Sequence, residues 1–456
     1  MSERHSRFLR GLLVTSLALS ALPALADEVL IRNGYIMPMS ADGKDYPQGD
    51  LLIKEGKIAA IGKDLPADGA RVIDASQHYV LPGFVDAHNH LWITNQRGLY
   101  RNAAGKFFPV SSQLAAAMQP EDIYSAMYNG ALELINSGVT TTGDFFDNIH
   151  GPAWGDAGLK ALQDAHIRAI LYYGGPDKTT RSPIDIKHLA LLASQPHPRV
   201  QLGLAWRLPR DLNNADNWAM RQQEFSAAQQ HHWPIQVHIS GEADAMFNAL
   251  IARKFLTPQV TVVHATDASP PQLQALQQAG ASLVTTPISE ARVGYGLTRL
   301  DHFQQISRQG IGIDGNSLSG SGDIFAVLRF AALTLSGGTR NESTPSARHL
   351  LELATRRGAE ALGLGNITGS LETGKRADIQ IISAQSPEMS GFAGGDPSAL
   401  LLYSTQPQDI QTVIIDGQIV KLNGVLQGVN YAEVLSKAQK SAAEVLHRSQ
   451  LSHTHQ

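Results

Sequence analysis

Two histidines spaced two residues apart, His88 and His90, follow an apolar stretch of the sequence. Residues two apart on a β-strand point to the same face, so the two imidazoles would lie side by side. Neutral imidazole is a common metal ligand, and two of them at one strand end supply half of a metal site. Because the chain has 17 histidines, such a pair also arises by chance. The pair indicates a metal site only if residues further along the chain supply more ligands.

Three more metal-capable side chains, His238, His264 and Asp314, end short β-branched or apolar runs. A mononuclear hydrolytic site uses three or four protein ligands and keeps one position for water. Its metal lowers the pKa of that water, and a nearby carboxylate or histidine takes the proton. Each residue alone could be a buried histidine or a loop-capping aspartate. Five such residues at the ends of four strands favour a single site.

The elements that would position these side chains alternate between about residues 84 and 365. The eight expected strands are Phe84–His90, Val139–Phe145, Arg168–Tyr173, Val200–Trp206, Ile235–Ile239, Gln259–His264, Ala281–Thr285 and Gly310–Asp314. Helical patterns lie between them, and they include Asp122–Ser137, Gln222–His231, Ala243–Phe255 and Pro271–Ala279. This order predicts an α/β fold with a (β/α)8 TIM-like barrel, in which strand ends meet at one face. An open doubly wound sheet is the alternative, but no Gly-x-Gly-x-x-Gly turn follows the first strand.

The two flanks of the barrel carry strand and turn patterns of a different kind. We expect residues 27–82 and 369–425 to form one small composite β-sandwich, with the barrel over 83–368. The tail, 426–456, contains a helical pattern over Ala432–Leu446.

Residues 1–26 have the pattern of a secretory signal peptide. Arginines precede a short apolar run, and Ala24-Leu25-Ala26 is a small-x-small cleavage site. The run is too short to span a bilayer, so no stable membrane anchor is expected. We therefore predict a periplasmic or secreted protein, cleaved near Ala26. The chain has no cysteine, so a metal must be held by histidines and carboxylates.

Composition limits the partners. The chain has 456 residues, 43% hydrophobic and 17% charged, and its net charge is −4. No cluster of lysines and arginines is present, so nucleic-acid binding is not expected. A small-molecule substrate is expected, and a homo-oligomer is left open.

Taken together, the motifs resemble the amidohydrolase superfamily, within it the branch of cytosine and guanine deaminases and triazine hydrolases. The matching segments are Leu81–His90, Gly138–Thr142, His238, His264, Asp314-Gly315 and Gly369–Asp378. The resemblance implies that His88, His90, His238 and Asp314 bind one Zn²⁺ or Fe²⁺ per chain. It also implies that His264 contacts the metal water or the substrate. The fourth strand lacks the lysine of the di-metal branch, which favours one metal.

The sequence departs from the family pattern at the proton shuttle. The deaminase branch places a glutamate three residues after the strand-five histidine, but here that residue is Gly241 and Glu242 follows it. Glycine would let the backbone return Glu242 to the site, whereas the alternative is a glutamate in the first turn of the next helix. With a catalytic Glu242 we expect deamination of a small N-heterocycle. Without it, His264 and Asp314 would move the protons, as in imidazolonepropionase-like or peptidase-like hydrolases of linear or cyclic amides.

Two substrate-binding residues are expected at the barrel mouth. Arg207 follows the fourth strand, where an arginine suits an oxo or anionic group; pairing with an acid such as Asp211 is the alternative. Trp92 could stack on a flat ring, as could Trp206 and Tyr295, although packing is the alternative for each.

Overall fold

The computed structural model describes residues 28–100, 106–176, 183–240 and 243–451. The predicted signal peptide and Glu242 lie outside the described residues. Within the described part, no helix has both the length and the apolar character needed to cross a membrane.

Eight parallel strands, hydrogen-bonded in chain order, form the central sheet. They are β6 (Phe84–Asn89), β7 (Val139–Phe146), β8 (Arg168–Tyr173), β9 (Val200–Trp206), β10 (Ile235–Ile239), β11 (Val260–His264), β12 (Ser282–Thr285) and β13 (Gln309–Ile311). The predicted barrel is confirmed, and seven strands end within one residue of the expected positions. The eighth is shorter than predicted, because it ends at Ile311 rather than Asp314.

The segment after β13 closes the barrel against β6. The Asp314 amide donates to the His88 carbonyl at 2.9 Å, and the His90 amide donates to the Asp314 carbonyl at 3.0 Å. Asp314 has φ 69°, in the left-handed region, so a regular strand cannot continue through it. Gly312 passes so close to β6 that a Cβ there would lie 2.6 Å from the His88 carbonyl oxygen. This seam brings Asp314 beside both histidines.

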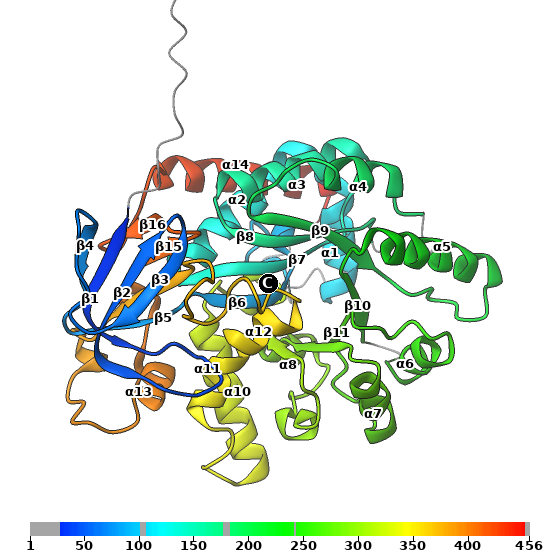
Figure 1. Cartoon of the computed structure of the whole chain (residues 1–456). Helices are drawn as coiled ribbons and strands as arrows, with labels where there is room; N and C mark the ends of the chain where they lie inside the picture. The colour runs from blue at the N-terminus through cyan, green and yellow to red at the C-terminus, as the bar shows by residue number, and fades with distance from the viewer. Residues whose placement is uncertain (1–27, 101–105, 177–182, 241–242, 452–456) are drawn as a thin grey trace, which may run out of the picture.

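Helices surround the barrel (Figure 1). They are α1 (Phe107–Ala117), α2 (Pro120–Asn136), α3 (Pro152–Asp164), α4 (Ile186–Ala193), α5 (Ala215–His231), α6 (Ala243–Ala252), α7 (Pro270–Gln278), α8 (Pro287–Val293), α9 (Asn316–Ser319), α10 (Ile324–Thr339), α11 (Ala347–Leu353), α12 (Arg356–Ala361), α13 (Pro397–Ser404) and α14 (Tyr431–Ser449). All four predicted helices are present. Helix α5 begins seven residues earlier than expected, because the Asn214 side chain caps it by accepting from the Asn217 amide.

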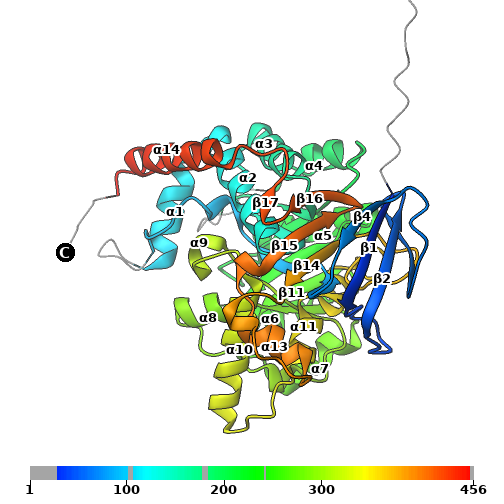
Figure 2. The ribbon, with the colours of Figure 1, turned by 90° about the vertical axis from the view of Figure 1, so that its left-hand side faces the viewer.

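Both flanks of the chain build one nine-stranded sheet beside the barrel (Figure 2). Its strands are β1 (Val29–Ile36), β2 (Tyr46–Lys54), β3 (Lys57–Gly62), β4 (Arg71–Asp74), β5 (His78–Pro82), β14 (Ile379–Ser383), β15 (Ile410–Ile415), β16 (Gln418–Leu422) and β17 (Val425–Leu426). Strand β14 from the second flank pairs antiparallel with β5 from the first. A separate apolar core lies within this composite domain.

Buried polar contacts join the composite sheet to the barrel. Arg168, at the start of β8, makes two hydrogen bonds to the Asp378 carboxylate, at 2.6 and 3.1 Å. The Lys421 ammonium on β16 donates to the carbonyl of Asn136, the last residue of α2, at 2.7 Å. A buried charge is tolerated when it is paired in this way.

The C-terminal helix packs against the barrel helices α1 and α2. The helix predicted over Ala432–Leu446 is found as α14, slightly longer at both ends. The Gln113 side chain on α1 donates to the Ser449 carbonyl at 2.7 Å. In return, Arg448 Nε donates to the carbonyl of Ala117, the last residue of α1, at 3.0 Å.

Candidate metal centre and active site

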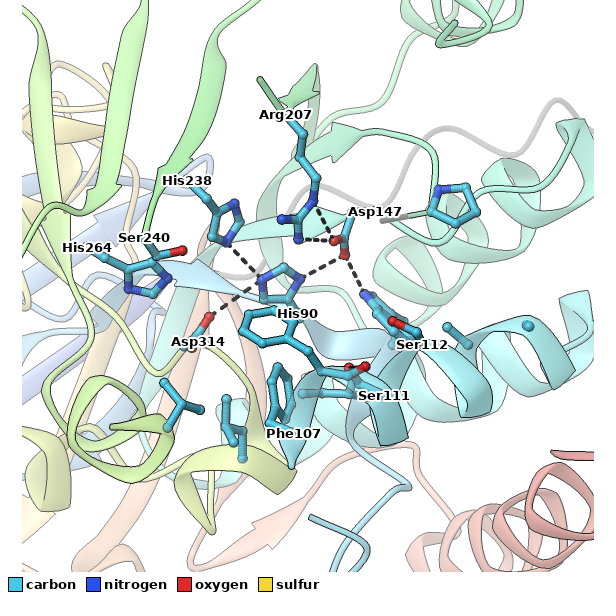
Figure 3. Close-up of a pocket in the computed structure, with 18 of the residues that line it drawn as sticks. His90, Phe107, Ser111, Ser112, Asp147, Arg207, His238, Ser240, His264 and Asp314 are labelled. Atoms are coloured by element: carbon cyan, nitrogen blue, oxygen red, sulfur yellow. Dashed lines mark hydrogen bonds and ion pairs between the residues drawn. The ribbon is translucent and has the colours of Figure 1, made fainter. Parts of the chain in front are cut away.

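All described side chains predicted for the metal centre meet at the carboxyl ends of the barrel strands. Figure 3 shows four of them, His90, His238, His264 and Asp314. His88 lies on β6 and His90 directly after it, while His238 lies on β10 and His264 ends β11. Asp314 joins them through the seam after β13. The barrel therefore gathers residues that are up to 226 positions apart in the chain.

The potential ligand atoms are close enough to share one cation. His88 Nε2 lies 3.2 Å from Asp314 Oδ1, and His90 Nε2 lies 3.5 Å from the same oxygen. The Nε2 atoms of His90 and His238 are 3.2 Å apart. Single ligand atoms of His88, His238, His264 and Asp314 all lie within 4.8 Å of one another.

The opposite nitrogens of two ligand candidates are fixed by hydrogen bonds. His88 Nδ1 lies 2.8 Å from Gln236 Oε1, and Gln236 Nε2 donates to the Ala87 carbonyl, so the amide presents its oxygen to the imidazole. His90 Nδ1 lies 3.0 Å from Asp147 Oδ1. Both rings therefore carry their proton on Nδ1 and direct the Nε2 lone pair to the shared space.

Burial and neighbouring charges favour metal-binding protonation states. Burial lowers the pKa of His88 to about 4, and burial together with the Arg207 charge holds the pKa of His238 well below its usual range. Burial alone would raise the pKa of Asp314, but the close approach of His88 and the other nearby histidines outweighs it and lowers that pKa. The carboxylate to which His90 Nδ1 donates outweighs burial and raises the pKa of His90. At neutral pH the centre thus offers neutral imidazoles at His88 and His238 and an ionised carboxylate at Asp314.

Asp147 is a site residue that sequence reasoning missed. Its Oδ1 accepts from His90 Nδ1 and from Trp92 Nε1, the latter at 2.9 Å, and its Oδ2 accepts from Arg207 Nε at 3.1 Å. Burial alone would raise the pKa of Asp147, but the charges of Arg207 and His90 outweigh it and hold that pKa far below its usual range. An available signal was its position at the end of the apolar run of β7, the same pattern that identified the histidines.

A cavity lies above the centre and, with its open mouth, encloses about 900 Å³. Its lining includes both predicted substrate residues, Arg207 and Trp92, and also Tyr295. Helix α1 supplies one wall, which the sequence did not predict. The α1 residues in the lining are Phe107, Phe108, Ser111, Ser112, Ala115 and Ala116.

Of the residues expected to face the substrate, Arg207 reaches the cavity and Trp206 does not. Trp206 is wrong as a stacking residue: it is fully buried and packs on Phe225 and Phe255, because its side chain points into the layer between β9 and α5. Arg207 does reach the cavity, where its guanidinium holds Asp147.

Two of the site residues have unusual backbone conformations. His264 and Asp314 both have positive φ, 72° and 69°, which is uncommon for residues other than glycine. Such conformations persist only where the surrounding contacts impose them, and they concentrate at functional sites. His264 ends β11 and Asp314 follows β13 by three residues, and both side chains turn toward the common centre.

Comparison with known proteins agrees with this geometry. The model of the amidohydrolase family matches residues 79–420. Among curated relatives, 5'-deoxyadenosine deaminase of Methanosarcina mazei is 27% identical over 446 residues, covering 92% of this chain and 99% of the relative. The 5-methylthioadenosine/S-adenosylhomocysteine deaminase of Pyrococcus furiosus is 27% identical over 439 residues, covering 90% and 99%.

Solved structures show the same fold. An adenosine deaminase from Xanthomonas campestris with bound zinc superposes with a TM-score of 0.80 at 20% identity, covering 93% of this chain and all of that one. The zinc complex of atrazine chlorohydrolase from Arthrobacter aurescens has a TM-score of 0.80 at 22% identity, covering 91% and 100%. This chain belongs to the amidohydrolase family. The resemblance predicted from the motifs is therefore confirmed.

Proposed function

We propose that the chain is a metal-dependent deaminase, which uses water to release ammonia from a small N-heterocycle. Family membership makes it a hydrolase of carbon–nitrogen bonds other than peptide bonds. The observation that carries the proposal is the convergence of histidine imidazoles and one carboxylate at the barrel mouth. The names of the two curated relatives given above, a 5'-deoxyadenosine deaminase and a 5-methylthioadenosine/S-adenosylhomocysteine deaminase, support deamination over amide hydrolysis.

One divalent cation, Zn²⁺ or Fe²⁺, fits this centre. His88, His90, His238 and Asp314 would hold it, because their lone pairs face one space at separations where they repel unless a cation or proton lies between them. The His238 Nδ1 atom is buried and has no hydrogen-bond partner among the described residues, so it is free to carry the proton while Nε2 binds. When bound, the metal supplies a Lewis acid that acidifies the attacking water.

The surrounding residues would orient the reactants and move protons. His264 would contact the water or the ring, and Asp314 would accept a proton. Glu242 would take a proton from the water and deliver it to the leaving amino nitrogen, which is the role of a general acid–base. Arg207 and Trp92 would contact the ring from the side of the cavity.

A zinc-loaded protein offered a panel of aminated purines, purine nucleosides, pyrimidines, pterins and triazines tests the proposal. We expect stoichiometric ammonia from at least one ring substrate and no reaction with N-acyl amino acids or cyclic amides. Hydrolysis of the amides with formation of a carboxylate, and no ammonia from any ring, would overturn the deaminase assignment.

We further propose that the mature protein is exported and begins at Asp27. The support is the arginine-rich start, the short apolar run and the Ala24-Leu25-Ala26 site in the sequence. N-terminal sequencing of the exported protein should give Asp27. Active protein that keeps Met1 and stays in the cytoplasm would contradict export.

A further inference from the structure

A fully buried carboxylate, Glu290 on helix α8, lies behind His264 and outside the set of metal-ligand candidates. Its side chain is inaccessible to solvent. Glutamate is rarely buried unless it is paired, so its partners are informative. The Glu290 Oε1 atom lies 3.2 Å from His264 Nδ1. This distance suits a hydrogen bond between the imidazole and the carboxylate.

The remaining contacts fix the carboxylate in place. The Thr286 amide donates to the same Oε1 atom at 2.8 Å, and the Thr298 hydroxyl donates to Oε2. Both oxygens are therefore held from the protein side, so the side chain cannot turn away from His264. Thr286 Oγ1 lies 3.1 Å from His264 Nδ1 and accepts from Ser289 at 2.8 Å.

These contacts determine which nitrogen of His264 carries the proton. Glu290 Oε1 already accepts from the Thr286 amide, so it faces His264 as an acceptor and Nδ1 is the donor. The Nε2 atom then has the lone pair. Since Nδ1 faces α8, Nε2 is the nitrogen available to the cavity that His264 lines with His238 and Asp314.

We propose that Glu290 is a positioning residue for the hydrolytic reaction, which fixes the tautomer and ring orientation of His264 so that its Nε2 accepts from the reacting water or the substrate. This role deepens the proposed function, and its kinetic test, which measures turnover, rests on that function. A carboxylate that orients a catalytic imidazole through Nδ1 is an arrangement used in other hydrolases. It also explains how His264 keeps its orientation despite a φ of 72°, since strained conformations need contacts that impose them.

The first test reads the tautomer directly and needs neither substrate nor activity. Protein labelled with ¹⁵N-histidine should show the Nδ1–H form for His264, assigned by the signal lost in His264→Ala. Glu290→Ala should move this signal to the Nε2–H form or to a mixture. Glu290→Gln should preserve it, because the amide oxygen still accepts. An Nε2–H form of His264 in the unmodified protein would overturn the proposal. This outcome does not depend on whether the Glu290 variants fold.

The second test is a double-mutant cycle on turnover. Glu290→Ala should lower kcat roughly 10–100-fold with little change in KM and in bound metal, as removal of an orienting partner usually does. Glu290→Gln should recover most of the loss. In a His264→Ala background, Glu290→Ala should cost less than about twofold more, because the two residues act as a unit. Equal losses in both backgrounds would show that Glu290 is merely structural.

Asp50→Asn is the matched control. Asp50 is also a buried carboxylate that accepts two backbone amides, from Asn33 and Leu65, but it lies in the nine-stranded sheet. Its loss should lower stability and leave kcat and the His264 tautomer unchanged. If the unmodified enzyme deaminates nothing, the proposed function fails while the tautomer experiment still decides the assignment of Glu290.

Discussion

The floor and the outer wall of the cavity are built in different ways. The floor, formed by His88, His90, His238, His264 and Asp314, comes from barrel strand ends, and buried partners fix most of its side chains. The outer wall is helix α1, whose aromatic and small residues face the cavity and whose end is fastened from outside by α14. The barrel thus determines where the reaction occurs, whereas an added helix shapes the space for the substrate. Changes in the floor should alter kcat and metal content, and changes behind the wall should alter KM.

The strongest test of this division is Asp314→Asn in the floor. The amide keeps the shape but loses the charge that stands 3.2 Å from His88 Nε2 and 3.5 Å from His90 Nε2. We expect loss of bound metal and a fall in kcat on the order of 10³-fold or more, because a catalytic metal supplies several kcal/mol. Elemental analysis and steady-state kinetics measure both. Full metal content with nearly normal turnover would remove Asp314 from the ligand set.

Glu242→Gln should affect the rate but not the metal. If Glu242 is the proton shuttle, turnover should fall roughly 10²–10⁴-fold, the contribution of a positioned acid–base group. Metal content should stay the same, since this residue is not a proposed ligand. Asp244→Asn, two residues further along the chain, is the control and should leave turnover unchanged. Normal turnover in Glu242→Gln would favour proton transfer by His264 and Asp314.

The contrast between floor and wall also explains what the sequence could predict. His238 and His264 follow short β-branched runs, and a strand end defines where such a residue lies in a barrel. Seven of the eight strands were therefore located almost to the residue. The exception is β13, which ends at Ile311, whereas the apolar pattern continues to Ile313. The left-handed backbone of Asp314, which a hydrophobic pattern does not reveal, excludes it from the strand.

Contacts between distant elements were beyond the reach of the sequence. The end of helix α1, which contacts the site, is held in part by α14, more than 300 residues later in the chain. The sequence did not predict a role for Glu290, because its contact with His264 arises only where α8 approaches the end of β11. Asp147 stood at a strand end, but nothing local connected it to His90 and Arg207.

Behind the wall, Arg448→Ala should have a moderate effect. The variant removes the hydrogen bond to the Ala117 carbonyl and the ion pair with Asp122, so the end of α1 loses its support. A hydrogen bond of this kind contributes about 0.5–1.5 kcal/mol, so we expect KM to rise roughly 2–10-fold while kcat and metal content stay constant. Lys440→Ala, on an exposed part of the same helix, should change neither. A fall in kcat with unchanged KM would contradict the separate roles of wall and floor.

The smallest effect is expected far from both regions, at Lys421. Burial lowers the pKa of this lysine from 10.5 to about 8, although its Nζ atom still donates to the Asn136 carbonyl at the end of α2. Below pH 8 the folded protein must bury an ammonium. Between pH 8 and 10.5 the folded state has released this proton while the unfolded state keeps it, so stability rises with pH.

Lys421→Met removes this titration while keeping an apolar stem of similar length. The stability of the unmodified protein relative to Lys421→Met should therefore increase between pH 8 and 10.5, by at most about 3 kcal/mol for a shift of this size. Urea unfolding of both proteins at several pH values measures the difference, and Lys57→Met, at an exposed lysine of the same sheet, is the control. A difference that stays constant over this range would show that Lys421 is charged in the folded protein, with its ammonium stabilised by the carbonyl end of α2. Since neither variant touches the floor or α1, kcat and KM at pH 7 should stay within about twofold of the unmodified enzyme, as for distant independent sites.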